Sequence, residues 1–247
     1  MMKECLVCGK TEVDLLFEKN GYQIVRCRHD GHIYVANPPT LAELGDFYAA
    51  AYFEGKNEVG YHHNVFEERD HHLKKANRKL GLLTRFLLTG KVLDVGSGPG
   101  FFVKQASHHF DSIGCEFSEA AVQYAQKELG VELFQGDFLD YQGGPFNAVT
   151  MWSYLEHALE PRKALMYAAD LLVPGGYLLL SIPNVEGVGR YAKGKSWRGF
   201  SPPEHLHFFT KANFKRLFAE TGFEYRDVPF SMNHFFRDTV YFCAQKK

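Results

Sequence analysis

The chain has 247 residues, and its 28 Lys and Arg balance 29 Asp and Glu to a formal net charge of −1 at pH 7. This balance gives no general attraction to nucleic-acid phosphates or an anionic bilayer, which excludes a nonspecific polyanion binder. A hydrophobic fraction of 45% and a charged fraction of 23% exclude a largely disordered chain. We expect one large folded core with a small additional unit.

The sequence contains no apolar stretch of the length that crosses a bilayer, about 18 residues or more. Its start, MMKECLVCGK, also lacks an apolar stretch of signal-peptide length. We therefore expect a cytoplasmic protein without a membrane partner. The 5 cysteines form an odd set with three members near the start of the chain, which is not typical of a disulfide framework.

Residues 1–40 are predicted to form a small β-rich unit, because short strand-like pieces alternate with glycine and proline. Cys5 and Cys8 are separated by two residues, and Cys27 comes at the start of a second, similar turn. Three thiolates in this spacing predict a structural zinc site like that of a zinc ribbon. Acidic and basic residues are balanced within this unit, so we expect no nucleic-acid partner.

The fourth zinc ligand is less well defined by the sequence. Asp30 stands where a zinc ribbon has its fourth cysteine, and a carboxylate oxygen is an acceptable zinc ligand. His29 and His32 are the alternatives for that position. A knuckle that folds without any metal is the other possibility.

Residues 41–88 have a helical pattern and are expected to connect this unit to a core over residues 89–247. In the core, apolar runs alternate with helical segments, which predicts an α/β fold with a doubly wound, mostly parallel sheet covered on both faces. The helices are expected at 101–110, from Ser118 onward, at 162–172 and at 211–221. The last two strands, 223–230 and 238–245, follow too closely for a crossover helix and should pair antiparallel.

The segment VLDVGSGPG ends a predicted buried strand and opens the next helix with three alternate glycines. Glycines there allow close approach of the backbone to a ligand, beyond what a tight turn without a ligand requires. A dinucleotide-binding loop is the rival interpretation, but Phe101 replaces the glycine that its fingerprint needs. Asp94 would repel a pyrophosphate, and it would favour a ligand that carries an ammonium and a sulfonium group.

Two further acids follow the next predicted strands. Glu116 ends the second strand and suits a ribose diol, and Asp137 with Phe138 closes the third, where an acid and an aromatic ring suit a base. The carboxyl ends of parallel strands meet at one edge of the sheet, which is where open α/β sheets bind ligands. We therefore expect Asp94, Glu116 and Asp137 to form one site.

From about Tyr61 to its C-terminus, the chain resembles the class I methyltransferases that use S-adenosylmethionine. VLDVGSGPG resembles their first motif, GDF at 136–138 their adenine motif, and LLVPGGYLLLSIPN their fifth-strand segment. The resemblance implies a seven-stranded sheet whose last strand is antiparallel, with Met151 and Trp152 closing over the methionine part of the cofactor. The cofactor-binding residues it implies are Asp94, Gly96, Ser97, Gly98, Gly100, Glu116, Phe117, Asp137, Phe138, Met151 and Trp152.

The segments LEH and PPEHLHFFT resemble those of family members that methylate small molecules, such as sugars of surface polysaccharides and quinone precursors. The sequence is therefore predicted to encode an enzyme that transfers a methyl group to a small-molecule acceptor by in-line displacement. An NAD-dependent oxidoreductase and a non-catalytic adaptor that binds the cofactor are the alternatives. The sequence does not predict the acceptor, the methylated atom or the oligomeric state.

Two histidines qualify by position as catalytic groups on the acceptor side, because an oxygen acceptor must lose a proton near neutral pH. His157 follows the fourth predicted strand, and His205 lies in the long loop 184–209, which is expected to form a lid or pocket wall. A purely structural role in fixing the turn is the alternative for His157. His205 and His207 could chelate a metal, but the sequence near them offers no third ligand, so we do not expect one.

Overall fold

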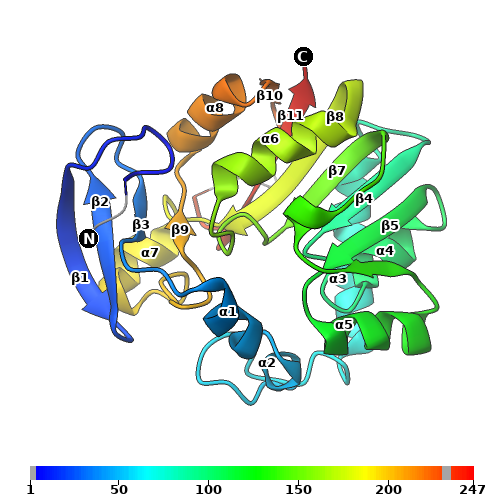
Figure 1. The fold of residues 1–247 in the computed structure, drawn as a ribbon, viewed down its shortest axis with the longest axis horizontal. Helices are drawn as coiled ribbons and strands as arrows, with labels where there is room; N and C mark the ends of the chain where they lie inside the picture. Colours follow the sequence, from blue (N-terminus) through cyan, green and yellow to red (C-terminus); the bar gives the residue numbers. More distant parts are fainter. Residues whose placement is uncertain (1–3, 230–234) are drawn as a thin grey trace.

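The computed structural model describes residues 4–229 and 235–247. A seven-stranded sheet forms its centre, in the order β10-β11-β8-β7-β4-β5-β6 (Figure 1). The strands are β4 (Lys91–Val95), β5 (Asp111–Glu116), β6 (Leu133–Gln135), β7 (Phe146–Trp152), β8 (Leu172–Pro183), β10 (Phe223–Arg226) and β11 (Thr239–Lys246). Strands β4 to β8 run parallel, and β11 pairs antiparallel with both β8 and β10. The predicted fold class and the antiparallel end of the sheet are confirmed.

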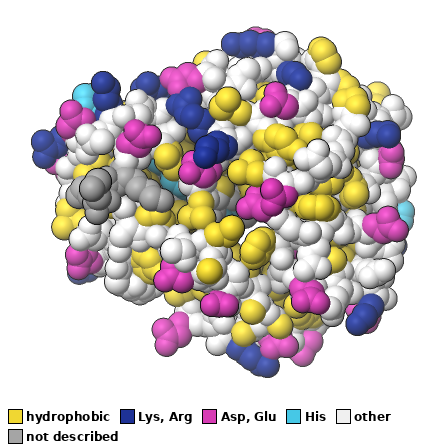
Figure 2. All heavy atoms as spheres, viewed as in Figure 1, with side chains coloured by type: hydrophobic (Ala, Val, Ile, Leu, Met, Phe, Trp, Pro, Cys, Tyr) yellow, Lys and Arg dark blue, Asp and Glu magenta, His cyan; other side chains and the backbone are white. Residues whose placement is uncertain are grey.

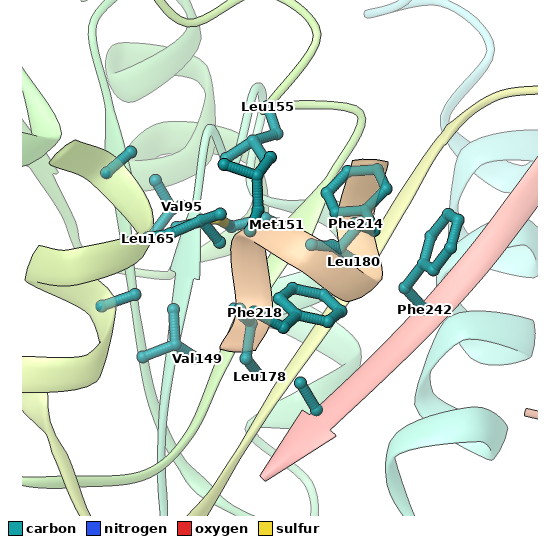
Figure 3. Packing of buried hydrophobic residues seen from close by; sticks show 14 of the residues in the cluster. Val95, Val149, Met151, Leu155, Leu165, Leu178, Leu180, Phe214, Phe218 and Phe242 are labelled. Atoms are coloured by element: carbon teal, nitrogen blue, oxygen red, sulfur yellow. The ribbon is translucent and has the colours of Figure 1, made fainter. Parts of the chain in front are cut away.

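Helices cover both faces of this sheet because neighbouring residues of each strand point to opposite faces. On one face, apolar side chains of β4, β7 and β8 pack against α6 (Pro161–Leu171) and α8 (Lys211–Glu220). Figure 3 shows part of this cluster, with Phe214 and Phe218 of α8 beside Leu178 and Leu180 of β8. On the other face pack α3 (Arg69–Leu83), α4 (Phe101–Ala106), α5 (Glu119–Tyr124) and the π-helical turn Ala125–Leu129.

The structure differs from the predicted elements in several places: α4 ends at Ala106 and not at 110, and β10 ends at Arg226. Strand β8 begins at Leu172, directly after α6, although proline and two glycines follow before Tyr177. An irregularity between Phe146 and Ala148 of the partner strand accommodates this stretch, as is usual for proline in a sheet. The predicted loop 184–209 contains α7 (Val188–Lys193), a 3-10 turn (Gly194–Ser196) and β9 (His207–Phe208).

A second, smaller sheet carries the N-terminal part of the chain. Its order is β1-β2-β3-β9, so its last strand comes from the segment after β8. The N-terminal strands are β1 (Val13–Lys19), β2 (Tyr22–Cys27) and β3 (Ile33–Val35), and Tyr34 of β3 pairs with His207 of β9. Cys5 and Cys27 pack in the same buried cluster as residues of the large sheet. The β-rich unit at 1–40 therefore shares a core with the rest of the chain.

Two short helices, α1 (Leu41–Phe47) and α2 (Ala50–Phe53), connect the two sheets (Figure 1). Thr40 and Glu43 form a reciprocal capping box at the start of α1, which satisfies two of the free amides of its first turn. Tyr52 and Phe53 are buried against Ala121 of α5. Within the described part of the chain, no helix combines the length and the apolar character needed to cross a membrane. Basic and acidic side chains are interspersed on the face shown in Figure 2.

Candidate active site

A cavity of about 1060 Å³ lies at the carboxyl ends of β4, β5 and β7. The sheet positions one wall, α1 and α2 contribute a second, and the segment after β8 contributes a third. Most of the residues predicted to bind a cofactor line it, together with both predicted catalytic histidines. They are Asp94, Gly96, Ser97, Gly98, Glu116, Phe117, Asp137, Phe138, Trp152, His157 and His205.

The glycine loop turns the chain sharply between β4 and α4. Gly96, Gly98 and Gly100 have φ angles of 68°, 52° and 82°, in the left-handed region that favours glycine. A Cβ atom at Gly96 would also lie 2.8 Å from the ring of Tyr154. Gly100 does not line the cavity; a Cβ atom there would crowd Val131 and Ala125. Its glycine is explained by packing under the loop.

The carboxylate of Asp94 is buried at the end of β4 with 3% of its surface exposed. Thr150 of β7 donates a hydrogen bond of 2.5 Å to its Oδ1. Burial raises the pKa of Asp94 to about 7, although that hydrogen bond and the nearby charge of Lys79 act in the opposite direction. Burial also lowers the pKa of Lys79 to about 8. A positive charge bound in the cavity would stabilise the ionised form of Asp94.

Glu116 is buried at the end of β5. Its Oε2 accepts from the amide of Gly98 at 2.7 Å, and its Oε1 accepts from the amide of Ser118 at 2.8 Å. These bonds hold the carboxylate against the glycine loop, and each oxygen keeps a further lone pair that can accept a hydroxyl. Phe117 beside it is 39% exposed, which leaves an aromatic face available on the cavity wall.

The third acid, Asp137, precedes the 3-10 turn Phe138–Asp140 and caps it by accepting from the amide of Leu139 at 2.8 Å. Phe138 is buried, and its ring packs edge-on against the rings of Tyr154 and Tyr167. The structure thus brings the three acids, at the ends of β4 and β5 and at the turn after β6, to one cavity. This agrees with the prediction from their positions at the ends of parallel strands.

Met151 and Trp152 are separated by the sheet. Trp152 lines the cavity, and its ring packs edge-on against Phe102 of α4. Met151 is fully buried on the opposite face, beside Leu155 and Leu180 (Figure 3), and does not reach the cavity. Consecutive residues of a strand point to opposite faces, so only one of this pair can cover a ligand there.

On the acceptor side, His157 contacts the connecting helices. Its Nδ1 lies 2.8 Å from the hydroxyl oxygen of Tyr48, which also contacts the carbonyl oxygen of Glu204 at 3.4 Å. Burial lowers the pKa of His157 to about 3, so the imidazole is neutral near pH 7. Tyr52 donates a second hydrogen bond of 2.8 Å to the carboxylate of Glu204.

The segment after β7 is joined to the segment before β9 through the backbone. The carbonyl oxygen of Glu156 accepts from the amides of Leu206 at 2.7 Å and His207 at 3.1 Å. The ring of His205 therefore lies against that of His157, with centroids 4.8 Å apart at 82°. Nδ1 of His205 lies 2.8 Å from the carbonyl oxygen of Gly199. The two predicted catalytic histidines thus share one corner of the cavity.

The N-terminal cysteines also come together. One ligand atom each of Cys5, Cys8, Cys27 and Asp30 lies within 4.8 Å of the other three. The sulfur atoms of Cys8 and Cys27 are 3.5 Å apart, and that of Cys5 is 3.6 Å from both oxygens of Asp30. Ligands about 2.3 Å from a tetrahedral zinc ion are separated by similar distances. The donor set fits a zinc ion.

Neither alternative fourth ligand belongs to the group whose ligand atoms all lie within 4.8 Å of one another. His29 points toward Glu12, with Nε2 3.3 Å from a carboxylate oxygen. His32 is fully buried, with Nδ1 3.5 Å from the sulfur of Cys5, and its ring stacks on Phe209 with centroids 4.8 Å apart. The geometry therefore places Asp30 among the sulfur atoms.

Several cavity residues were not predicted from the sequence. They are Tyr48, Tyr52, Lys79 and Glu156. Residues of these types are common in helices and turns without any function, so neither periodicity nor spacing distinguishes them. In the LEH segment, an acid next to a loop histidine is the one sequence signal available for Glu156.

Comparisons with known proteins agree with this geometry. Residues 61–228 match a family model described as methyltransferase domain. Over 111 residues the chain is 32% identical to the ubiquinone biosynthesis O-methyltransferase of Thiobacillus denitrificans, an overlap of 41% of this chain and 48% of the relative. The protein of the same name from Alkalilimnicola ehrlichii is 32% identical over 103 residues, 38% of this chain and 42% of the relative. The chain thus spans less than half the length of these curated relatives.

Two solved structures share the fold. One is a methyltransferase from Thermotoga maritima described as a possible histamine N-methyltransferase, with a TM-score of 0.57, 23% identity, and coverage of 74% of this chain and 95% of that one. The other is magnesium protoporphyrin IX methyltransferase from Synechocystis with bound S-adenosylhomocysteine, with a TM-score of 0.61, 18% identity, and coverage of 84% and 100%. At these identities the similarity concerns the fold alone.

Proposed function

The chain belongs to the methyltransferase-domain family, and from this premise we propose that it transfers a methyl group from S-adenosylmethionine to a small-molecule acceptor by in-line displacement. The observation that carries the proposal is the meeting of Asp94, Glu116 and Asp137 with the glycine loop in one cavity that extends to His157 and His205. The names of the two curated relatives support an oxygen of a small molecule as the methylated atom.

The charged, hydrogen-bonding and aromatic groups of the cavity suit this cofactor. S-adenosylmethionine supplies an electrophilic methyl group on a positively charged sulfur. Burial raises the pKa of Asp94 to about 7, so a positive charge bound beside it would stabilise its ionised form. Glu116 is placed to accept the ribose hydroxyls, and the exposed ring of Phe117 is placed to stack on the base. The Synechocystis neighbour with bound S-adenosylhomocysteine supports the same choice.

The proposed role of the chain is to align the acceptor with the methyl group and to exclude water, because the reaction needs no covalent nucleophile from the protein. His157 and His205 are the proposed catalytic groups, because they share the corner of the cavity where the acceptor oxygen would react. Tyr48 acts as a positioning residue, because its contact with Nδ1 fixes the ring of His157. Trp152 closes the cavity beside Lys79, whose ammonium lies 5.6 Å from the centre of its ring.

We further propose that Cys5, Cys8, Cys27 and Asp30 bind a structural zinc ion. The sulfur and oxygen separations given above support this donor set. Such an ion would stabilise the turns that frame the small sheet, which is too short to maintain a core alone.

Calorimetric titration of the chain with S-adenosylmethionine, S-adenosylhomocysteine and NAD tests the main proposal. We expect binding of the first two and none of NAD, and mass-spectrometric detection of a methylated product from a panel of hydroxylated small molecules. Tight NAD binding without a response to S-adenosylmethionine would replace the proposal with an oxidoreductase. Cofactor binding without transfer to any acceptor would favour a non-catalytic adaptor.

A further inference from the structure

A group of three electron-pair donors lies on the acceptor side of the cavity. One ligand atom each of Glu156, His157 and His205 lies within 4.8 Å of the other two, and all three residues line the cavity. Glu156 is 0% exposed, and within the described residues neither of its carboxylate oxygens has a hydrogen-bond partner. A buried carboxylate without donors is unfavourable unless it is protonated or paired with a positive charge.

The protonation of His205 can be assigned from its neighbours. Its Nδ1 lies 2.8 Å from the carbonyl oxygen of Gly199. A carbonyl oxygen only accepts hydrogen bonds, so Nδ1 carries the proton of the neutral ring and Nε2 keeps its lone pair. This lone pair is directed away from Gly199, and Nε2 lies 3.9 Å from a carboxylate oxygen of Glu204.

His157 shows the same pattern through Tyr48. The hydroxyl oxygen of Tyr48 lies 2.8 Å from Nδ1 of His157 and 3.4 Å from the carbonyl oxygen of Glu204. When that hydroxyl donates to Glu204, it accepts from Nδ1–H of His157. Nε2 of His157 then keeps a lone pair and lies 3.7 Å from Oε1 of Glu156. In this arrangement two imidazole lone pairs lie close to the carboxylate of Glu156.

We infer that Glu156, His157 and His205 bind a divalent transition-metal ion at the acceptor end of the cavity. Metal-bound histidines usually donate their other ring N–H to a carbonyl, a carboxylate or water. His205 does so here to the carbonyl oxygen of Gly199, and Nδ1 of His157 has the hydroxyl oxygen of Tyr48 as its partner. Two imidazoles and one carboxylate suit Zn²⁺, Fe²⁺ or Co²⁺ and leave coordination positions open. This inference rests on the proposed methyl transfer, in which the ion would coordinate the oxygen atom of the acceptor that receives the methyl group.

Among the possible metal-binding groups in the described residues, the contacts favour Glu156, His157 and His205 as a further site. Lys79 attracts Glu156 electrostatically, but it gives the carboxylate no hydrogen bond, so it does not replace an ion. His63, Glu68 and His72 form another group of three, but Glu68 is exposed and already lies 3.4 Å from Nε2 of His63. The cysteine group is a separate site with softer donors.

Titration with Co²⁺ tests the inference without any measurement of activity. The protein is first loaded with zinc so that the cysteine group is occupied, and zinc bound elsewhere is removed by a weak chelator. We expect visible d–d absorption from one further Co²⁺ per chain. A thiolate-to-cobalt charge-transfer band would instead indicate exchange at the cysteine group.

Three variants and one control make the assignment specific. Glu156→Gln and His205→Gln are expected to lose the Co²⁺ absorption. Tyr48→Phe removes a partner of a ligand, so Co²⁺ affinity should fall by about 10–100-fold while the same absorption is reached at saturation. Glu160→Gln makes the same change of charge four residues away from Glu156, at an exposed side chain paired with Lys163, and should bind Co²⁺ as the unmodified chain does.

The inference is overturned if the zinc-loaded chain shows no d–d absorption, or if Glu156→Gln and His205→Gln both retain it. Circular dichroism of each variant shows whether it is folded, and Tyr48→Phe still tests the site if a ligand variant is not. Titration of the same samples with S-adenosylhomocysteine separates the two proposals. If the chain binds the cofactor but not Co²⁺, the metal site is contradicted and the proposed methyl transfer stands. If it binds Co²⁺ but not the cofactor, only the proposed methyl transfer is contradicted.

Discussion

The carbonyl oxygen of Glu156 accepts a hydrogen bond of 2.7 Å from the amide of Leu206. This bond joins the loop after β7 to the segment that continues into β9, and β9 pairs with β3 of the small sheet. The acceptor corner of the cavity is therefore connected to the cysteine group through backbone hydrogen bonds. The N-terminal unit is therefore placed to hold the acceptor corner of the cavity in position, whereas the large sheet holds the glycine loop in position.

This connection predicts different responses at the two ends of the cavity. Cys27→Ser should lose one equivalent of zinc and loosen the β3–β9 pairing, because the small sheet has little core of its own. We expect affinity for S-adenosylhomocysteine to stay within about twofold, and the acceptor KM to rise.

Metal analysis, calorimetry and steady-state kinetics measure these three quantities. Cys243→Ser is the matched control, since Cys243 is equally buried but lies in β11 of the large sheet. Equal zinc in Cys27→Ser and the unmodified chain would contradict the zinc site.

Replacing Asp94 tests the charge of the cofactor site. Its pKa of about 7 means that the carboxyl is protonated below that pH and ionised above it. Because an ionised Asp94 attracts a cationic ligand, the apparent affinity for S-adenosylmethionine should rise by up to about tenfold per pH unit toward pH 7 and level off above it. Calorimetry from about pH 5.5 upward measures this slope. In Asp94→Asn the affinity should be weaker and the slope absent; a slope retained in that variant would assign the titration to another group.

The role of Glu116 in binding the ribose can be tested with Glu119 as the control. Glu116→Gln places an amide NH₂ against the backbone amides of Gly98 and Ser118, which both donate to the carboxylate. Loss of a hydrogen bond to a charged group should weaken S-adenosylhomocysteine binding by about 1.5–3 kcal/mol, roughly 10–100-fold. Glu119→Gln removes the same charge from the exposed first turn of α5 and should bind normally. Equal affinities for the two variants, measured by calorimetry, would exclude Glu116 from the site.

The glycine loop can be tested against a glycine outside it. Gly130→Ala at φ 62° has no atom within 4 Å of the new Cβ, so it should lower the free energy of unfolding by the left-handed penalty alone, about 1–2 kcal/mol. Gly96→Ala adds the contact at 2.8 Å with Tyr154 and should be more destabilising. Chemical denaturation measures both changes.

Cofactor affinity distinguishes these two variants further. We expect Gly96→Ala to bind S-adenosylhomocysteine more weakly than the unmodified chain, because the loop lines the cavity. Gly130→Ala should bind it normally, since Gly130 lies at the end of the π-helical turn. Weaker binding by both would mean that general destabilisation, and not the loop, reduces the affinity.

The cofactor end of the cavity could be predicted because its determinants are local. Asp94, Glu116 and Asp137 each end a strand or begin a turn, and parallel strands bring their carboxyl ends to one edge whatever the details of packing. The short spacing before β11 predicted antiparallel pairing in the same way. Met151 was misplaced at the ligand, although the alternation of side chains along β7 already assigned it to the face opposite Trp152.

The sequence by itself thus determined the sheet and the line of acids along its edge, since these follow from periodicity and from spacing within single segments. Its motifs also carried the resemblance to the family. Only the tertiary structure decided the acceptor corner, where Tyr48, Glu156 and His205 meet from three distant parts of the chain. It also decided that β9 completes the small sheet. Contacts of this kind arise from the packing of whole elements against one another, and no local pattern of residues encodes which side chains will meet there.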